Sequence, residues 1–448
     1  MIDSLRIRSI FTALLALALL APAVFPRDAA SREYLDAARA TELWIRSSAI
    51  RTSDGTIWPP DPNNPQMLSY DLYSGSTGVV LFYLEFYKQR HEPIFQFDYA
   101  LDGASALAKH MDQEKDPGLY TGLAGMCFAL GEAYRLFPNP REKADALRCF
   151  QILRERAVKV GAGAQWNDTT DIIGGSAGIG LTLLYAARRL KDRAALDLAV
   201  QAGLRLIELG RPENGGLKWA MDPKFPRLMP NFSHGTAGVA YFLATLYQVT
   251  KRKQFLDAAL AGARYLRSIA VTDGGICLIF HNEPFAKDIH YLSWCHGPAG
   301  TARLFYRLYQ VTGDRSWMDW VKKSARGVLS SGIPEKRTPG FWNNVGQCCG
   351  SAGVAEFFLG LYRVTRDPEY LVFARRVTSD LLSRATREGS GAASTLKWIQ
   401  AEHRLAPQQL VAQTGYMQGA AGIGIWLLHL DAFDHGRRPF ITLPDSPF

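Results

Sequence analysis

The chain has 448 residues, of which 47% are hydrophobic and 21% are charged. This is an ordinary globular composition that excludes an intrinsically disordered chain, and a single apolar run of near-membrane length excludes a protein with many membrane spans. The formal net charge is +9, but Lys and Arg form no block or stripe that would indicate nucleic-acid binding. Six cysteines are too few for a disulfide-rich scaffold.

The N-terminal segment has the layout of a secretory signal peptide. Two basic residues, Arg6 and Arg8, precede an apolar run at residues 10–25. Small residues that suit cleavage lie at residues 21–23 or, as a second choice, at residues 29–30. The apolar run is shorter than the ~20 residues of a stable membrane-spanning helix. We therefore expect residues 1–23 to be removed on export to the periplasm or the exterior. An uncleaved N-terminal membrane anchor is the alternative.

Internal repetition dominates the rest of the sequence. A G-x-x-G tetrad recurs seven times, at residues 75–78, 122–125, 175–178, 235–238, 297–300, 350–353 and 419–422. Each tetrad opens a stretch that is apolar on nearly all sides, such as residues 239–247, which indicates a buried helix. An amphipathic helical segment then follows, such as residues 316–321. The glycines allow a tight turn and a close approach of helix ends.

Each repeat therefore predicts one inner and one outer helix. An open stack of such repeats would need capped ends, whereas a closed ring buries both ends. The sequence thus predicts an all-α fold, an α/α toroid of seven inner and seven outer helices, with residues 31–440 as its single domain.

The residues just before each tetrad should meet at the mouth of this toroid. Three of the six cysteines occupy such positions, at Cys295, Cys348 and Cys349. Thiolates suit zinc, and three protein ligands with an open fourth position are typical of a catalytic zinc site. We expect these three cysteines to bind zinc, with buried free thiols or a disulfide as the alternative. The other three, Cys127, Cys149 and Cys277, are interpreted as core packing.

The tetrads of units four to six, S-H-G-x-x-G, W-C-H-G-x-x-G and C-C-G-x-x-G, resemble those of the lanthionine synthetase C-like family, and the resemblance spans residues 35–435. It implies an α/α toroid with a central zinc ion held by Cys295, Cys348 and Cys349. It also implies thioether formation, in which a zinc-bound cysteine thiolate of a peptide adds to dehydroalanine or dehydrobutyrine to give lanthionine or methyllanthionine.

The resemblance also assigns two proton-handling residues. His234 matches the family's active-site histidine, and an unperturbed pKa of ~6.5 suits that role. Asp171 in D-I-I-G-G-S-A-G matches a family carboxylate that orients the peptide or assists proton transfer. From the residues alone, His234 could instead be a cap, Asp171 could bind turn amides, and His296 could either transfer protons or neighbour the metal.

Three features depart from the family pattern. Cys349 replaces the usual histidine, and a third thiolate would make a bound substrate thiolate more nucleophilic at the cost of weaker Lewis acidity. Residues 287–293 lack the arginine that often precedes the first zinc cysteine. An export signal is unusual for a peptide cyclase, and no segment of this chain resembles a dehydratase, so a separate dehydratase would be its partner.

Other functions remain as alternatives. The chain could add glutathione or another small thiol to dehydrated proteins, or it could be an exported, non-catalytic toroid that binds zinc or a peptide. A sugar epimerase or glycosidase on a related toroid would need paired carboxylates or histidines. The mouth offers one aspartate and three cysteines, so this last class is disfavoured. No nucleic-acid partner is expected, and no membrane contact beyond an N-terminal anchor.

Overall fold

The structure of the protein, a computed structural model, describes residues 32–90, 95–224 and 228–448. The predicted signal peptide, residues 1–23, lies outside the described residues. Within the described ranges, no helix combines the length and the apolar character needed to cross a membrane.

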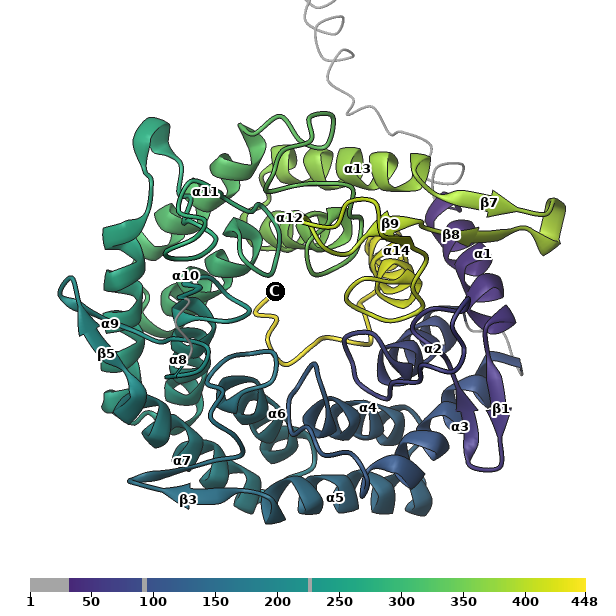
Figure 1. Cartoon of the computed structure of the whole chain (residues 1–448), viewed down its shortest axis with the longest axis horizontal. Helices are drawn as coiled ribbons and strands as arrows, with labels where there is room; N and C mark the ends of the chain where they lie inside the picture. Colours follow the sequence, from purple (N-terminus) through teal and green to yellow (C-terminus); the bar gives the residue numbers. More distant parts are fainter. Residues whose placement is uncertain (1–31, 91–94, 225–227) are drawn as a thin grey trace, which may run out of the picture.

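Two concentric rings of helices form a toroid (Figure 1). In the described part of the chain, the inner ring consists of α2 (Ser76–Arg90), α4 (Leu123–Leu136), α6 (Ser176–Arg189), α8 (Thr236–Thr250), α10 (Pro298–Thr312), α12 (Ser351–Thr365) and α14 (Ala420–Asp434). The outer ring consists of α1 (Glu33–Ser47), α3 (Phe95–His110), α5 (Pro140–Glu155), α7 (Arg193–Leu209), α9 (Lys253–Ile269), α11 (Ser316–Leu329) and α13 (Pro368–Ser383). The predicted all-α toroid with seven inner and seven outer helices is confirmed.

The ring is closed by a helix from the start of the described chain. Six outer helices follow their inner partners in sequence, as the repeats predict. The last inner helix, α14, has no outer helix after it and packs instead against α1. Both ends of the repeat array are thereby buried, which removes the exposed end faces that an open array would have to cap.

Short antiparallel hairpins decorate the helical rings. Four of them follow outer helices and pair β1 (Ile50–Thr52) with β2 (Gly55–Ile57), β3 (Val158–Val160) with β4 (Gly163–Gln165), β5 (Arg211–Glu213) with β6 (Gly216–Lys218), and β7 (Thr386–Glu388) with β8 (Thr395–Lys397). The 3₁₀ turn η1 (Asp273–Gly275) follows α9, and η2 (Gly391–Ala393) lies in the connection between β7 and β8. A fifth hairpin, β9 (Gln400–Ala401) with β10 (Leu410–Val411), presents the loop 402–409 at the mouth of the toroid.

The tetrad glycines make room for backbone at the helix starts. A Cβ atom at Gly235, which caps α8, would lie 1.6 Å from the carbonyl oxygen of Met229. A Cβ atom at Gly300, in the first turn of α10, would lie 1.8 Å from the carbonyl oxygen of Trp294. Both distances are far inside van der Waals contact, so the incoming loop can fold over the helix start only where the side chain is absent.

The end of the chain turns back into the toroid, where the final segment crosses the interior of the ring (Figure 1). The fully buried carboxylate of Asp445 accepts hydrogen bonds of 3.2 Å from Tyr120 Oη, Trp294 Nε1 and Arg303 Nη1. The ring of Phe448 stacks on Tyr306 with centroids 4.9 Å apart. This segment therefore lies inside the ring and is held there by contacts of Asp445 and Phe448 with side chains of the toroid.

The interpretation of Cys127 and Cys149 as simple core packing was wrong. Both are fully buried, but they form a disulfide that joins inner helix α4 to outer helix α5. They lie on facing sides of one helix pair, and the sequence spacing alone does not reveal that facing. Cys277 is a free, buried thiol, as expected, and burial raises its pKa to about 11.

Candidate functional site

A closed belt of backbone hydrogen bonds links the seven loops that precede the tetrads. Each loop donates an amide hydrogen to a carbonyl of a neighbouring loop, in the order Tyr73 to Tyr120, Tyr120 to Ile173, Ile172 to Ser233, Ser233 to Cys295, Cys295 to Cys348, Cys348 to Met417 and Met417 to Tyr73. The donor–acceptor distances run from 2.8 to 3.2 Å. The belt fixes the loops against one another, so side chains at these positions have defined places at the mouth.

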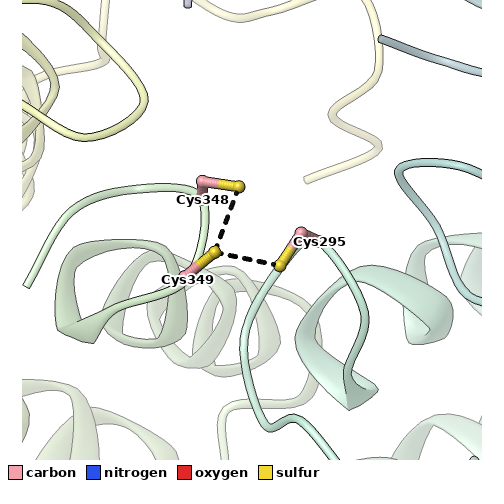
Figure 2. Close-up of side chains that lie close together, drawn as sticks. All are labelled: Cys295, Cys348 and Cys349. Atoms are coloured by element: carbon pink, nitrogen blue, oxygen red, sulfur yellow. Dashed lines mark hydrogen bonds between the residues drawn. The ribbon is translucent and has the colours of Figure 1, made fainter. Parts of the chain in front are cut away.

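Three cysteine sulfurs converge within this belt (Figure 2). Cys295 precedes α10, and Cys348 and Cys349 precede α12. The Cys349 Sγ lies 3.3 Å from that of Cys295 and 3.4 Å from that of Cys348, and the three ligand atoms all lie within 4.8 Å of one another. Within the described ranges, this is the one group of three or more His, Cys, Asp or Glu side chains whose ligand atoms lie close enough together to hold a metal ion. The structure therefore brings together the three cysteines that the sequence singled out.

The thiols shift one another's acidity. Burial opposes ionisation of Cys295, but hydrogen bonds from Cys348 and Cys349 and the neighbouring His296 lower its pKa well below the usual value. The hydrogen bonds with Cys295 raise the pKa values of Cys348 and Cys349 well above the usual value for a cysteine thiol. The three thiols therefore do not ionise independently, and a cation among them would favour the ionisation of all three.

His234 and Asp171 form a pair beside the sulfurs. The Nδ1 atom of His234 lies 2.6 Å from Oδ2 of Asp171. A carboxylate oxygen accepts hydrogen bonds, so Nδ1 carries the hydrogen, and in a neutral imidazole Nε2 is then the nitrogen that can accept a proton. The His234 side chain is 27% exposed whereas that of Asp171 is 1% exposed. The pair therefore presents an oriented imidazole, supported from behind by a buried carboxylate.

Asp171 uses its second oxygen for the local turn. Its Oδ1 accepts hydrogen bonds of 2.9 Å from the amides of Gly174 and Gly175. Asp71, at the same position before the first tetrad, makes the corresponding turn contacts with the amides of Ser74 and Gly75. The turn binding that the sequence offered as an alternative role for Asp171 is therefore present, together with the contact to His234.

His296 lies behind the entrance, packed among aromatic rings. Its ring is 4.5 Å from that of His281 and 5.5 Å from that of His234, measured between centroids. Burial lowers its pKa to about 3, despite the opposing effect of Cys295. Its Nδ1 atom is buried and has no hydrogen-bond partner in the described structure. His296 is therefore a neutral neighbour of Cys295, and it is not a member of the cysteine group.

A pocket of about 250 Å³ opens over the sulfurs and is lined by Gln418, a pre-tetrad residue expected at the mouth, and by Arg404, which sequence reasoning missed. Gln418, the residue before the last tetrad, donates hydrogen bonds to Tyr73 Oη (2.9 Å) and to Cys349 Sγ (3.8 Å). Arg404, from the β9–β10 loop, donates to Tyr291 Oη (3.3 Å). Residues 287–293 carry no arginine, as the sequence showed, and Arg404 brings a cation to this pocket from a distant part of the chain. Arg404 lies outside every repeat motif, so the sequence did not indicate that it belongs to the site.

The donor set fits zinc. Three buried sulfurs face one another without an intervening side chain, and soft thiolate ligands in this number select zinc among the common divalent ions. The pocket above them leaves space for a fourth ligand. Cys295, Cys348 and Cys349 are thus the residues that could hold the ion, as the sequence predicted.

Comparison with known proteins agrees with this fold. The family described as "Lanthionine synthetase C-like protein" matches residues 66–443. Glutathione S-transferase LANCL1 of Danio rerio is 20% identical over 310 residues, which cover 67% of this chain and 71% of that protein. Among solved structures, nisin cyclase superposes with a TM-score of 0.62 at 14% identity and covers 92% of this chain and 96% of its own.

A second structural neighbour shows how widely this fold is used. An inactive variant of an α-1,6-mannanase of Salegentibacter sp. superposes with a TM-score of 0.52 at 14% identity, over 90% of this chain and 99% of its own. At such identities the similarity concerns the fold alone. The helical toroid defines the structural class of the protein. Because the family match spans most of the chain, the protein belongs to the lanthionine synthetase C-like family.

Proposed function

We propose that the protein is a zinc-dependent enzyme that adds a thiol to dehydroalanine or dehydrobutyrine, forming a lanthionine or methyllanthionine thioether. The observation that carries this proposal is the placement of three mutually close sulfurs and an oriented His–Asp pair around one pocket. Membership in the lanthionine synthetase C-like family and the fold shared with nisin cyclase support it.

The proposed roles follow from the chemistry of each group. Cys295, Cys348 and Cys349 hold the zinc ion, which when bound acts as a Lewis acid that favours the ionised form of a substrate thiol. The Nε2 atom of His234 accepts the proton of that thiol, and Asp171 holds the ring in the tautomer that can do so. The sulfur then bonds to Cβ of the dehydro residue, the C=C bond becomes single, and His234 returns the proton to Cα. All atoms and electrons are accounted for without a further reactant.

A glutathione-type reaction is the second candidate. Arg404 and Tyr291 line the same pocket, and a guanidinium is suited to bind a free carboxylate. A small thiol such as glutathione carries free carboxylates. The relative in Danio rerio is named a glutathione S-transferase. In this version the thiol comes from a small molecule and the acceptor is a dehydrated residue of a protein.

We also propose that the protein acts after export. The N-terminal segment has the composition of a signal peptide, and the disulfide between Cys127 and Cys149 is a feature typical of oxidising compartments. A dehydratase acting elsewhere would supply the dehydro residues. An exported toroid that binds zinc or a peptide without catalysis is the remaining alternative.

Two substrates distinguish these candidates. The zinc-loaded protein is incubated with a dehydroalanine peptide that contains its own cysteine, and with a cysteine-free dehydroalanine peptide plus glutathione. Mass spectrometry detects a glutathione adduct directly by its added mass. A ring has the same mass as the open peptide, so it is distinguished from that peptide by its failure to react with a thiol-labelling reagent. Enzyme-dependent ring formation supports the cyclase and adduct formation supports the second candidate. Background rates with both substrates, from a protein that retains zinc, would leave the binding toroid as the better account.

Arg404 offers an internal control for the second candidate. Arg404→Gln should raise KM for glutathione by about tenfold, the worth of one charge-assisted hydrogen bond, and leave KM for cysteamine, which has no carboxylate, unchanged. An equal effect on both thiols would contradict carboxylate binding by Arg404.

A further inference from the structure

The end of the toroid opposite the cysteines contains a large cavity. The inner helices begin at the cysteine mouth and end near this cavity of about 970 Å³, which is lined by the ends of α4, α6 and α8 and by part of the final segment, residues 437–448. An inner helix of this length spans roughly 20 Å. The cavity is therefore separate from the zinc site, and the function proposed above makes no use of it.

The lining of this cavity is rich in arginine. Glu132, the one carboxylate side chain among the lining residues, forms an ion pair with Arg135. Arg437, which also lines the cavity, forms an ion pair with Asp431. Five further arginines line the cavity without an ion pair to any carboxylate of the described chain, and they are Arg188, Arg189, Arg307, Arg363 and Arg438. We call this cavity with its five unpaired arginines the arginine chamber.

Arg307 gives an independent indication that the chamber is suited to an anion. It lies within α10 and is only 9% exposed. Its guanidinium donates to Gln248 Oε1 and to Tyr241 Oη, both neutral, while its buried Nε has no partner. A buried guanidinium without a counter-charge is costly, so this arrangement is better explained by a ligand that supplies one.

The helix dipole explains only part of the cluster. Arg188 and Arg189 lie in the last turn of α6 and Arg363 in the last turn of α12, where cations are favourable. That effect does not place Arg307, which lies before the last turn of α10. The cations also repel one another, since burial and then the charges of Arg189 and Arg307 lower the pKa of Arg188. An anion bound among them would relieve this repulsion.

We propose that the arginine chamber binds a small organic polyanion that presents phosphate or carboxylate oxygens. Guanidinium groups recognise both through paired N–H donors. The volume is at the upper end of the ~300–1,000 Å³ of typical ligand pockets, and Leu184, Val249 and Phe440 provide apolar wall for the organic part of the ligand. Recognition of a charged head beside an apolar body fits a metabolite-sized ligand.

Calorimetric titration of the zinc-loaded protein with tripolyphosphate and, separately, with citrate tests the proposal and distinguishes the two anion types. Binding of either anion should be saturable and should weaken about tenfold or more in Arg307→Gln and in the double variant Arg188→Gln/Arg189→Gln. Arg188 and Arg189 lie at the exposed end of α6, so the double variant is expected to fold, and thermal unfolding checks that it does. Arg315→Gln, at the start of outer helix α11, removes one charge outside the chamber and should bind as the parent does.

Three results would overturn the proposal. The first is no saturable binding of either anion up to about 10 mM, which corresponds to a negligible affinity. The second is parental affinity in the folded double variant. The third is equal weakening in Arg315→Gln, which would reduce the effect to net charge. None of these results depends on thiol addition, so the proposal stands or falls separately from the proposed enzyme activity.

Discussion

His234 and Asp171 are 63 positions apart in sequence and meet at 2.6 Å. Their places before a tetrad predicted that both would lie at one end of the ring, and the family resemblance assigned their roles. Their hydrogen bond could not be predicted, since it depends on how units three and four are rotated within the belt. Arg404 was missed for a related reason, because it belongs to an insertion, the β9–β10 loop, to which no repeat position corresponds.

Asp171→Asn separates the two tasks of this residue. The amide keeps a carbonyl oxygen for the glycine amides of the turn, so the unfolding free energy should change by less than about 1 kcal/mol. The buried charge that supports His234 is lost, and the rate of thiol addition should fall by roughly 10²-fold or more, within the usual worth of acid–base assistance.

Asp171→Ala and His234→Ala are the matched comparisons. The first should lose stability as well as rate, because two amides lose their acceptor. The second should keep both zinc and stability while the rate falls. Steady-state kinetics and urea unfolding measure both quantities. Parental rates in Asp171→Asn would remove the carboxylate from the mechanism.

Among the elements, the inner helices were predictable because their glycine tetrads mark each start and their apolar faces mark their burial. The position of each inner helix start, one residue after a tetrad glycine, agrees with the sequence. Two features of this scale were not predictable. The pairing of α1 with α14 requires knowledge that the ring closes, and the disulfide between α4 and α5 requires their rotation about the helix axes.

A buried charge cluster should make the contact among three inner helices sensitive to pH. His429 of α14 lies between Glu356 of α12 (3.4 Å) and Glu85 of α2 (3.7 Å). Burial disfavours the cation, but the two carboxylates outweigh it and raise the pKa of His429 to about 9. The pKa in the folded protein thus lies above the unfolded value of ~6.5. The protonated histidine therefore stabilises the fold fully below pH ~6.5, and this stabilisation is lost as the pH rises through about 9.

We therefore expect the unfolding free energy of the parent to fall, relative to that of His429→Gln, by on the order of 1–3 kcal/mol between pH ~6.5 and ~9. Urea unfolding of both proteins across this range measures the difference, and contributions of other groups cancel in the subtraction. A difference that stays constant with pH would show that His429 is neutral in the folded protein.

For the whole molecule, both ends of the described chain complete the toroid. The helix α1 closes the outer ring, and the final segment crosses the interior of the ring. Asp445 connects that segment to the site, because Trp294, which donates to it, is the neighbour of Cys295. The repeats gave no indication of this segment, since it follows the last of them.

Asp445→Ala should therefore destabilise the protein by roughly 3–5 kcal/mol, as expected when one partner of a buried ion pair is removed and Arg303 is left uncompensated. Asp445→Asn, which keeps one acceptor oxygen for either Tyr120 or Trp294, should recover part of the loss. Chemical unfolding of the three proteins gives the comparison. Equal stability of parent and alanine variant would mean that the segment is not held by this contact.

The zinc content of the mature protein, purified from its native compartment without added metal, tests the central claim most directly. Metal analysis should find about one zinc per chain in the parent, as for three thiolate ligands with an open position, and clearly less after Cys349→Ser, while thermal unfolding shows that the variant is folded. A parent free of zinc, with Cys295, Cys348 and Cys349 oxidised or all reactive toward a thiol reagent, would contradict the metal site and with it the proposed chemistry.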